Sequence, residues 1–94
     1  MEEKAIALLE VQAMVAAIAG LDAMCKAANV QFIRCEKRLG GRLVTVVVEG
    51  TVAACQASLE AGKAEAAKVG KVKLGEVIPR PHPEVMKFLK PKKA

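Results

Sequence analysis

Two valine-containing segments in the middle of the chain, separated by a short link, constrain the fold more than any other feature. Residues 30–37 and residues 43–48 both have the β-branched content that is typical of strands. The link between them holds Gly40 and Gly41, and adjacent glycines supply the positive φ angles that a tight antiparallel connection needs. The sequence therefore predicts a β-hairpin with residues 38–42 as its turn.

The segment before the hairpin changes from strand to helix periodicity. Residues 5–9 form a nearly continuous apolar run, followed by Glu10 and Val11, which predicts a central strand. From Ala13 onward, apolar residues recur at the spacings of one helical stripe. The stripe residues are Met14, Ile18, Leu21, Cys25 and Ala28. Asn29 follows the stripe and is expected to end the helix in the left-handed conformation.

A second helix and a fourth strand follow the hairpin. Thr51 is expected to cap a helix that continues to residue 69. Its predicted inner side consists of Val52, Cys55, Leu59 and Ala66. Gly62 lowers helix propensity by about 1 kcal/mol relative to Ala, which indicates close backbone contact at this position. Residues 72–78 predict a strand, and residues 84–90 predict a short helix after a proline-rich turn.

The resulting order, β-α-β-β-α-β plus a C-terminal helix, predicts an α+β fold. Right-handed crossovers place both long helices on one face of a four-stranded antiparallel sheet, the ferredoxin-like arrangement. The other face needs cover from the terminal helix and partner subunits, or else it binds something. We expect one domain over residues 1–90 and a short basic tail over residues 91–94. With no Trp or Tyr, the core must consist of small apolar side chains, and association with other chains is expected to add burial.

Charge and cysteine content argue against several classes of protein. The net charge of +5 suggests nucleic-acid binding, but the chain lacks the aromatic platforms on which single-stranded bases stack. The three cysteines show no CxxC pattern, so neither a zinc site nor a redox pair is indicated, and their odd number is typical of a reducing cytoplasm. No apolar stretch is long enough to span a bilayer. We expect no nucleic-acid or membrane partner, no metal and no cofactor.

Catalytic groups are also sparse. The single histidine, His82, lies among prolines and is better interpreted as a hydrogen-bonded turn residue at a subunit contact than as a base. No two acids occupy neighbouring strand positions as an acid/base couple would. Cys25 and Cys55 lie on helix stripes and are expected to be buried as small apolar residues. The position of Cys35 on a strand leaves open whether its side chain is buried. The sequence therefore predicts that the chain has no catalytic residues and is not an enzyme.

Several segments together resemble the single-domain, hexamer-forming shell proteins of bacterial microcompartments. The most specific are Asp-Ala-Met-Cys-Lys-Ala-Ala-Asn at residues 22–29 and Ile-Pro-Arg-Pro-His at residues 78–82. The resemblance implies a structural subunit of a cytoplasmic shell that encloses enzymes. It also implies cyclic homo-hexamers that meet neighbouring hexamers and other shell proteins edge to edge, each with a central pore for small metabolites.

The resemblance assigns roles to named residues. At the edge between hexamers it places Lys26, Asn29, Arg80 and His82. In the pore loop it places Lys37, Arg38, Leu39, Gly40, Gly41 and Arg42. This loop departs from the family pattern of apolar-Gly-Ser-Gly after the lysine, because it is about one residue longer and lacks the serine. It also has no cysteine of the kind with which some shell relatives hold a metal cluster.

The arginines of the loop leave two alternatives for the pore. Cyclic symmetry repeats every residue around one axis, so Arg38 or Arg42 facing the opening would form a ring that concentrates anions. Otherwise both guanidinium groups spread over the surface, paired with Glu36 or solvent, and glycine backbone lines the constriction. For the whole chain, the alternative function is a regulatory module of ferredoxin-like fold that binds a small metabolite.

Overall fold

The computed structural model describes residues 4–90 and has the element order that the sequence predicts. The strands are β1 (Lys4–Val11), β2 (Gln31–Arg38), β3 (Leu43–Thr51) and β4 (Val72–Pro79). The helices are α1 (Met14–Ala27), α2 (Val52–Ala66) and α3 (Pro83–Leu89), and a 3₁₀ turn, Leu39–Gly41, joins β2 to β3. α2 ends before residue 69, because hydrogen-bonded turns follow Ala66. The predicted tail, residues 91–94, lies outside the described residues.

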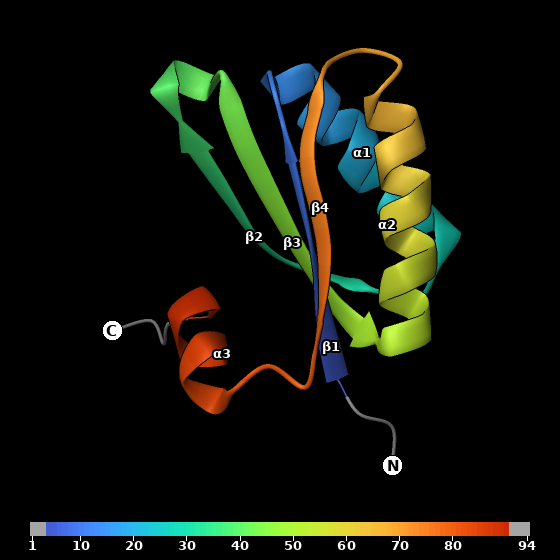
Figure 1. Ribbon diagram of the computed structural model, residues 1–94, viewed down its shortest axis with the longest axis vertical. Helices are drawn as coiled ribbons and strands as arrows, with labels where there is room; N and C mark the ends of the chain where they lie inside the picture. The colour runs from blue at the N-terminus through green and yellow to red at the C-terminus, as the bar shows by residue number, and fades with distance from the viewer. Residues whose placement is uncertain (1–3, 91–94) are drawn as a thin grey trace.

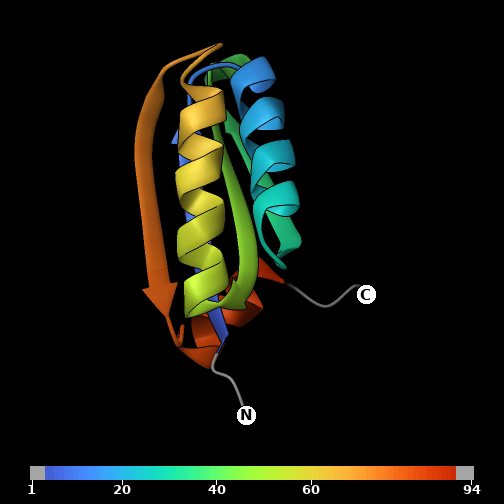
Figure 2. The ribbon, with the colours of Figure 1, turned by 90° about the vertical axis from the view of Figure 1, so that its right-hand side faces the viewer.

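The four strands form one antiparallel sheet in the order β2-β3-β1-β4. α1 and α2 lie side by side on one face of this sheet, and α3 lies on the other face (Figure 1, Figure 2). The predicted α+β class is confirmed. β1 pairs with both β3 and β4, in agreement with the central position that its continuous apolar run predicts.

The strand register defines two ends of the sheet. At the hairpin end, Arg38 pairs with Leu43. At the opposite end, which we call the far end, Lys4 pairs with Thr51 and Ala5 pairs with Pro79. The hairpin loop and the β4–α3 connection therefore lie at opposite ends of the sheet.

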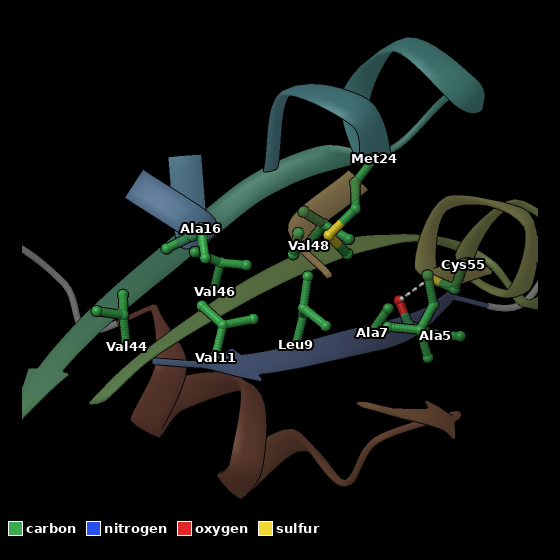
Figure 3. Close-up of a cluster of buried hydrophobic side chains, with 13 residues drawn as sticks. Ala5, Ala7, Leu9, Val11, Ala16, Met24, Val44, Val46, Val48 and Cys55 are labelled. Atoms are coloured by element: carbon green, nitrogen blue, oxygen red, sulfur yellow. Dashed lines mark hydrogen bonds between the residues drawn. The ribbon is translucent and has the colours of Figure 1, made fainter. Parts of the chain in front are cut away.

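A core of small apolar side chains fills the space between the sheet and the two long helices (Figure 3). The residues that β1 contributes, Ala5, Ala7, Leu9 and Val11, are fully buried. The two helices approach closely: a Cβ added to Gly62 would lie 2.5 Å from Cγ of Met24 and 3.2 Å from the Gly20 carbonyl oxygen. The close backbone contact predicted at Gly62 is confirmed.

The predicted stripe does not form the buried side of α1. The buried residues of this helix are Ala16, Ala17, Gly20 and Met24. Ile18, by contrast, is 62% exposed, and Cys25 is also exposed. Small residues of α1 permit close packing against α2. Met14 and Leu21 of the predicted stripe are partly buried against the core, whereas Ile18 and Cys25 point outward. α1 presents an apolar outer surface that includes Val15 and Ile18.

α3 covers part of the second sheet face. Leu89 packs there against Ile6 and Val47, and Met86 adds partly buried contact. The terminal helix thus shields one end of this face, which is one of the alternatives that the sequence left open. The rest of the face, toward the hairpin end, is not covered by α3 (Figure 1).

Of the two predicted helix ends, one is confirmed and one is wrong. The Thr51 hydroxyl accepts a hydrogen bond from the Ala54 N–H at 3.0 Å and caps α2 as predicted. Asn29 does not adopt the left-handed conformation, since α1 ends at Ala27 and Ala28 is already extended, with φ of −155°. The chain therefore leaves α1 directly toward β2 without a left-handed turn.

Candidate pore loop and assembly edge

The loop between β2 and β3 has a left-handed backbone over three consecutive residues. The φ angles are 55° at Leu39, 67° at Gly40 and 89° at Gly41. The positive φ angles predicted for the two glycines are confirmed, whereas Leu39 adopts this region at a cost of about 1–2 kcal/mol. The Arg42 N–H closes the turn by donating to the Leu39 carbonyl at 3.3 Å. Leu39 is 65% exposed, so the loop presents an apolar side chain to its surroundings.

The two arginines of the loop differ in their contacts. Nε of Arg42 donates to the Leu39 carbonyl at 3.2 Å, which folds this guanidinium back over the loop. Within residues 4–90, no hydrogen bond or ion pair engages the Arg38 guanidinium. Glu36, a partner that one of the alternatives named, forms its ion pair with Arg34 instead. Arg38 is therefore the loop arginine whose guanidinium no described group holds in place.

The loop lies next to the start of α1. Met14 of α1 and the loop residues from Lys37 to Gly41 line a hollow of about 440 Å³. The Ala13 N–H donates to the Arg42 carbonyl at 3.3 Å, which ties the helix start to the loop. All six residues predicted for the pore loop are therefore brought together at the hairpin end.

Lys26 lies in the last turn of α1 with 76% of its side chain exposed. Its Nζ is 2.8 Å from Oδ2 of Asp22, and this confirms the pairing that the four-residue spacing predicts. The hydrogen bond from Lys26 to Asp22, and then the negative charge of Asp22, raise the pKa of the lysine, so its ammonium group stays charged. Asn29 follows in the exposed connection to β2, where its carbonyl oxygen lies beside Gly50.

Arg80 and His82 lie in the turn between β4 and α3. The Arg80 N–H donates to the Lys4 carbonyl at 3.0 Å, and Arg80 has a φ of 48°. Nδ1 of His82 accepts a hydrogen bond from the Glu84 N–H at 3.1 Å and caps α3. The interpretation of His82 as a hydrogen-bonded turn residue is confirmed.

The structure separates the two predicted sets of residues. The pore-loop residues occupy the hairpin end, whereas Arg80 and His82 follow the far end of β4 and Asn29 lies beside the far end of β3 (Figure 1). With a rise of about 3.3 Å per residue, a strand as long as β3 places its ends more than 20 Å apart. One subunit can thus present the loop toward an axis and its other end toward a neighbouring assembly.

The cysteines fall into two groups. Cys55 is buried, its thiol donates to the Ala5 carbonyl at 3.4 Å (Figure 3), and burial raises the pKa of the thiol. The prediction for Cys55 is confirmed, but that for Cys25 is wrong, since Cys25 and Cys35 are both exposed. Within the described part of the chain, no three His, Cys, Asp or Glu side chains are grouped so that they could hold a metal ion. No helix of residues 4–90 is both long and apolar enough to cross a membrane.

Glu49 has a structural role that the sequence reasoning missed. It is 4% exposed, and its Oε1 lies 3.0 Å from Nζ of Lys90 and 3.8 Å from Nζ of Lys4. The ion pair with Lys90 joins the end of α3 to β3. Removing the lysine would leave the buried Glu49 carboxylate without its nearest cation. The only signal in the sequence is an acid that directly follows the apolar run of β3.

Known proteins resemble this chain over most of its length. The BMC domain family matches residues 5–81. The bacterial microcompartment shell protein PduA of Citrobacter freundii is 47% identical over 89 residues, which are 95% of this chain and 95% of that protein. The shell protein EutM of Escherichia coli is 44% identical over 79 residues, which are 84% of this chain and 80% of that protein.

A solved structure has the same fold. The crystal structure of a microcompartments protein from Desulfitobacterium hafniense DCB matches with a TM-score of 0.81 and 33% identity over 98% of this chain. This chain spans about half the length of that protein, 51% of it. With the family match and the high identity over nearly its full length, the chain belongs to the BMC domain family, the shell proteins of bacterial microcompartments.

Proposed function

We propose that this chain is a structural subunit that forms cyclic hexamers, that these tile edge to edge into a microcompartment shell in the cytoplasm, and that it has no catalytic activity. The observation that carries the proposal is the 47% identity to the shell protein PduA over 95% of both chains. The strand order and the two long helices on one face support the ferredoxin-like arrangement expected for such a subunit. Its partners would be further copies, other shell proteins and the enclosed enzymes.

The surface of the single subunit supports association. Large apolar side chains are exposed on several elements, including Ile18 at 62%, Phe32 at 50% and Leu74 at 56%. Contact with other chains would remove this apolar area from water. The core itself consists largely of Ala and Val, so burial between subunits would add substantially to the stability of the fold.

The hairpin loops would surround the central pore, and small metabolites would cross the shell through this pore. In a six-fold ring, each loop residue occurs six times around the axis, so a single charge becomes a ring of charges. Arg42 is held by the Leu39 carbonyl, whereas no contact within residues 4–90 holds the Arg38 guanidinium. Arg38 is therefore the residue that we propose makes the pore favour anionic metabolites over cations.

Replacing Arg38 with alanine is expected to lower the anion-over-cation selectivity of the pore by roughly fivefold or more, because the ring of guanidinium charges is lost. The measurement is the reversal potential of single pores in planar bilayers under a potassium chloride gradient. R42A is the matched control from the same loop, and it should change the selectivity less than twofold. Equal selectivity of R38A and the unmodified protein would contradict the charged-ring proposal while leaving the shell role intact.

A further inference from the structure

The sheet face that carries α3 has a hollow between that helix and the hairpin end. Its volume is about 370 Å³, which lies within the range of small-ligand pockets, ~300–1,000 Å³. Leu8, Leu43 and Val47 supply apolar lining from the strands, and Phe88 and Leu89 supply it from the end of α3. Apolar walls with a few convergent polar groups are the usual composition of a ligand site.

Two of the charged groups in the hollow satisfy each other. Arg34 and Glu36 form an ion pair. The Arg34 guanidinium also donates to the Phe88 carbonyl at 3.4 Å and lies 5.7 Å from the centre of the Phe88 ring. These contacts fix the wall of the hollow and leave neither charge available for another partner.

The other two charged groups in the hollow, Glu10 and Arg38, form no ion pair within the described residues. Glu10 is half-buried, and its Oε2 accepts a hydrogen bond from the Thr45 hydroxyl at 3.2 Å, but no ion pair to its carboxylate is formed within the described residues. The Arg38 guanidinium has no hydrogen bond or ion pair with any described residue. A carboxylate without a cation can accept a charge-assisted hydrogen bond from an ammonium group placed beside it.

The register sets the separation of these two charges. Glu10 pairs with Thr45, Thr45 pairs with Glu36, and Arg38 is the next residue of β2 on that face. Two strand spacings of ~4.8 Å and two residues of ~3.3 Å place the Cα atoms of Glu10 and Arg38 about 12 Å apart. Their side chains extend into the same hollow, one negative and one positive.

We propose that this hollow binds a small zwitterionic metabolite that carries an ammonium group and a carboxylate or phosphate joined by a short apolar chain. The ammonium group binds Glu10, the anionic group binds Arg38, and the apolar chain lies over Leu8 and Leu43. Arg38 is shared with the proposed pore loop, whereas Glu10 and the apolar floor belong to neither that loop nor the assembly edge. The site is therefore tested at Glu10, where a failure leaves the shell role untouched.

Binding of 4-aminobutyrate and 6-aminohexanoate to the assembled protein tests the site. By isothermal titration calorimetry, at least one of the two is expected to bind tenfold or more tightly than the amine and the acid of the same chain length. Methyl NMR spectra should show the largest shifts at Leu8, Leu43 and Val47. Binding no tighter than that of the singly charged analogues, or shifts located elsewhere, would overturn the proposal.

A glutamine at position 10 keeps the acceptor for Thr45 but removes the charge. E10Q is expected to weaken binding of the zwitterion about tenfold and to leave binding of the matching carboxylic acid unchanged. The control is E60Q, which removes an exposed carboxylate from α2, on the opposite side of the sheet. Unchanged zwitterion affinity in E10Q would overturn the proposal, and ring assembly measured on the same sample would show separately whether the shell role holds.

Discussion

Replacing Lys26 with alanine is expected to abolish extended protein sheets while leaving individual rings intact. Lys26 is 76% exposed, and its only ion pair in the described chain is the surface contact with Asp22. Because exposed pairs of this kind contribute little to folding, the subunit and the ring should form normally. At the proposed edge, however, a symmetric ring presents the lysine in every subunit, so one substitution removes all of these contacts at once.

Negative-stain electron microscopy of the purified protein measures this effect directly. K68A is the matched control, since Lys68 forms the same kind of exposed pair with Glu65, also at 2.8 Å, but lies beyond the end of α2. K68A should form sheets as the unmodified protein does, and K26A should give discrete particles. Sheets of normal size and order from K26A would rule out the edge role proposed for this residue.

Replacing Leu9 with alanine is expected to lower the free energy of unfolding by about 3 kcal/mol, within the range of ~2–5 kcal/mol for a core leucine. Leu9 is fully buried in the middle of β1, and its Cδ2 lies 2.8 Å from the position that a Cβ on Gly20 would occupy. The tight contact between sheet and α1 leaves little freedom to close the resulting cavity. Such a loss is a large fraction of the ~5–15 kcal/mol that stabilises a typical domain.

Urea denaturation at a fixed protein concentration provides the measurement, because association makes apparent stability depend on concentration. L74A is the matched control: Leu74 is 56% exposed on β4, so the same truncation removes little burial within the subunit. Equal losses for L9A and L74A would show that subunit contacts, rather than the core described here, dominate the stability of the protein.

The hairpin and the element order could be predicted because their signals are local. The β-branched content of residues 43–48, the glycine pair and the Thr51 cap each depend on a few neighbouring residues. The inner side of α1 could not be read in the same way. Periodicity selects the bulky apolar residues, whereas the buried side of α1 consists of Ala16, Ala17, Gly20 and Met24, of which Gly20 and Met24 lie against Gly62 of α2.

The candidate sites depend on contacts between residues that are distant in the sequence. Nothing near Arg38 or Arg42 in the sequence indicates that the left-handed loop turns the Leu39 carbonyl toward one arginine and not the other. The approach of Thr45 to Glu10 likewise follows from the pairing of β1 with β3, which pattern reading does not specify residue by residue. Resemblance to a known family supplied the positions of the loop and edge, but not these contacts.

In the proposed hexamer, copies of this chain close around an axis with the hairpin loop at its rim. Native mass spectrometry combined with cryo-electron microscopy of the purified protein measures both the number of copies and the position of the axis. We expect a particle of six times the 9.9 kDa chain mass, with six-fold symmetry and with Gly40 and Gly41 next to the axis. A well-folded sample that stays monomeric at high concentration, or a ring whose axis lies far from Gly40 and Gly41, would contradict the hexameric arrangement.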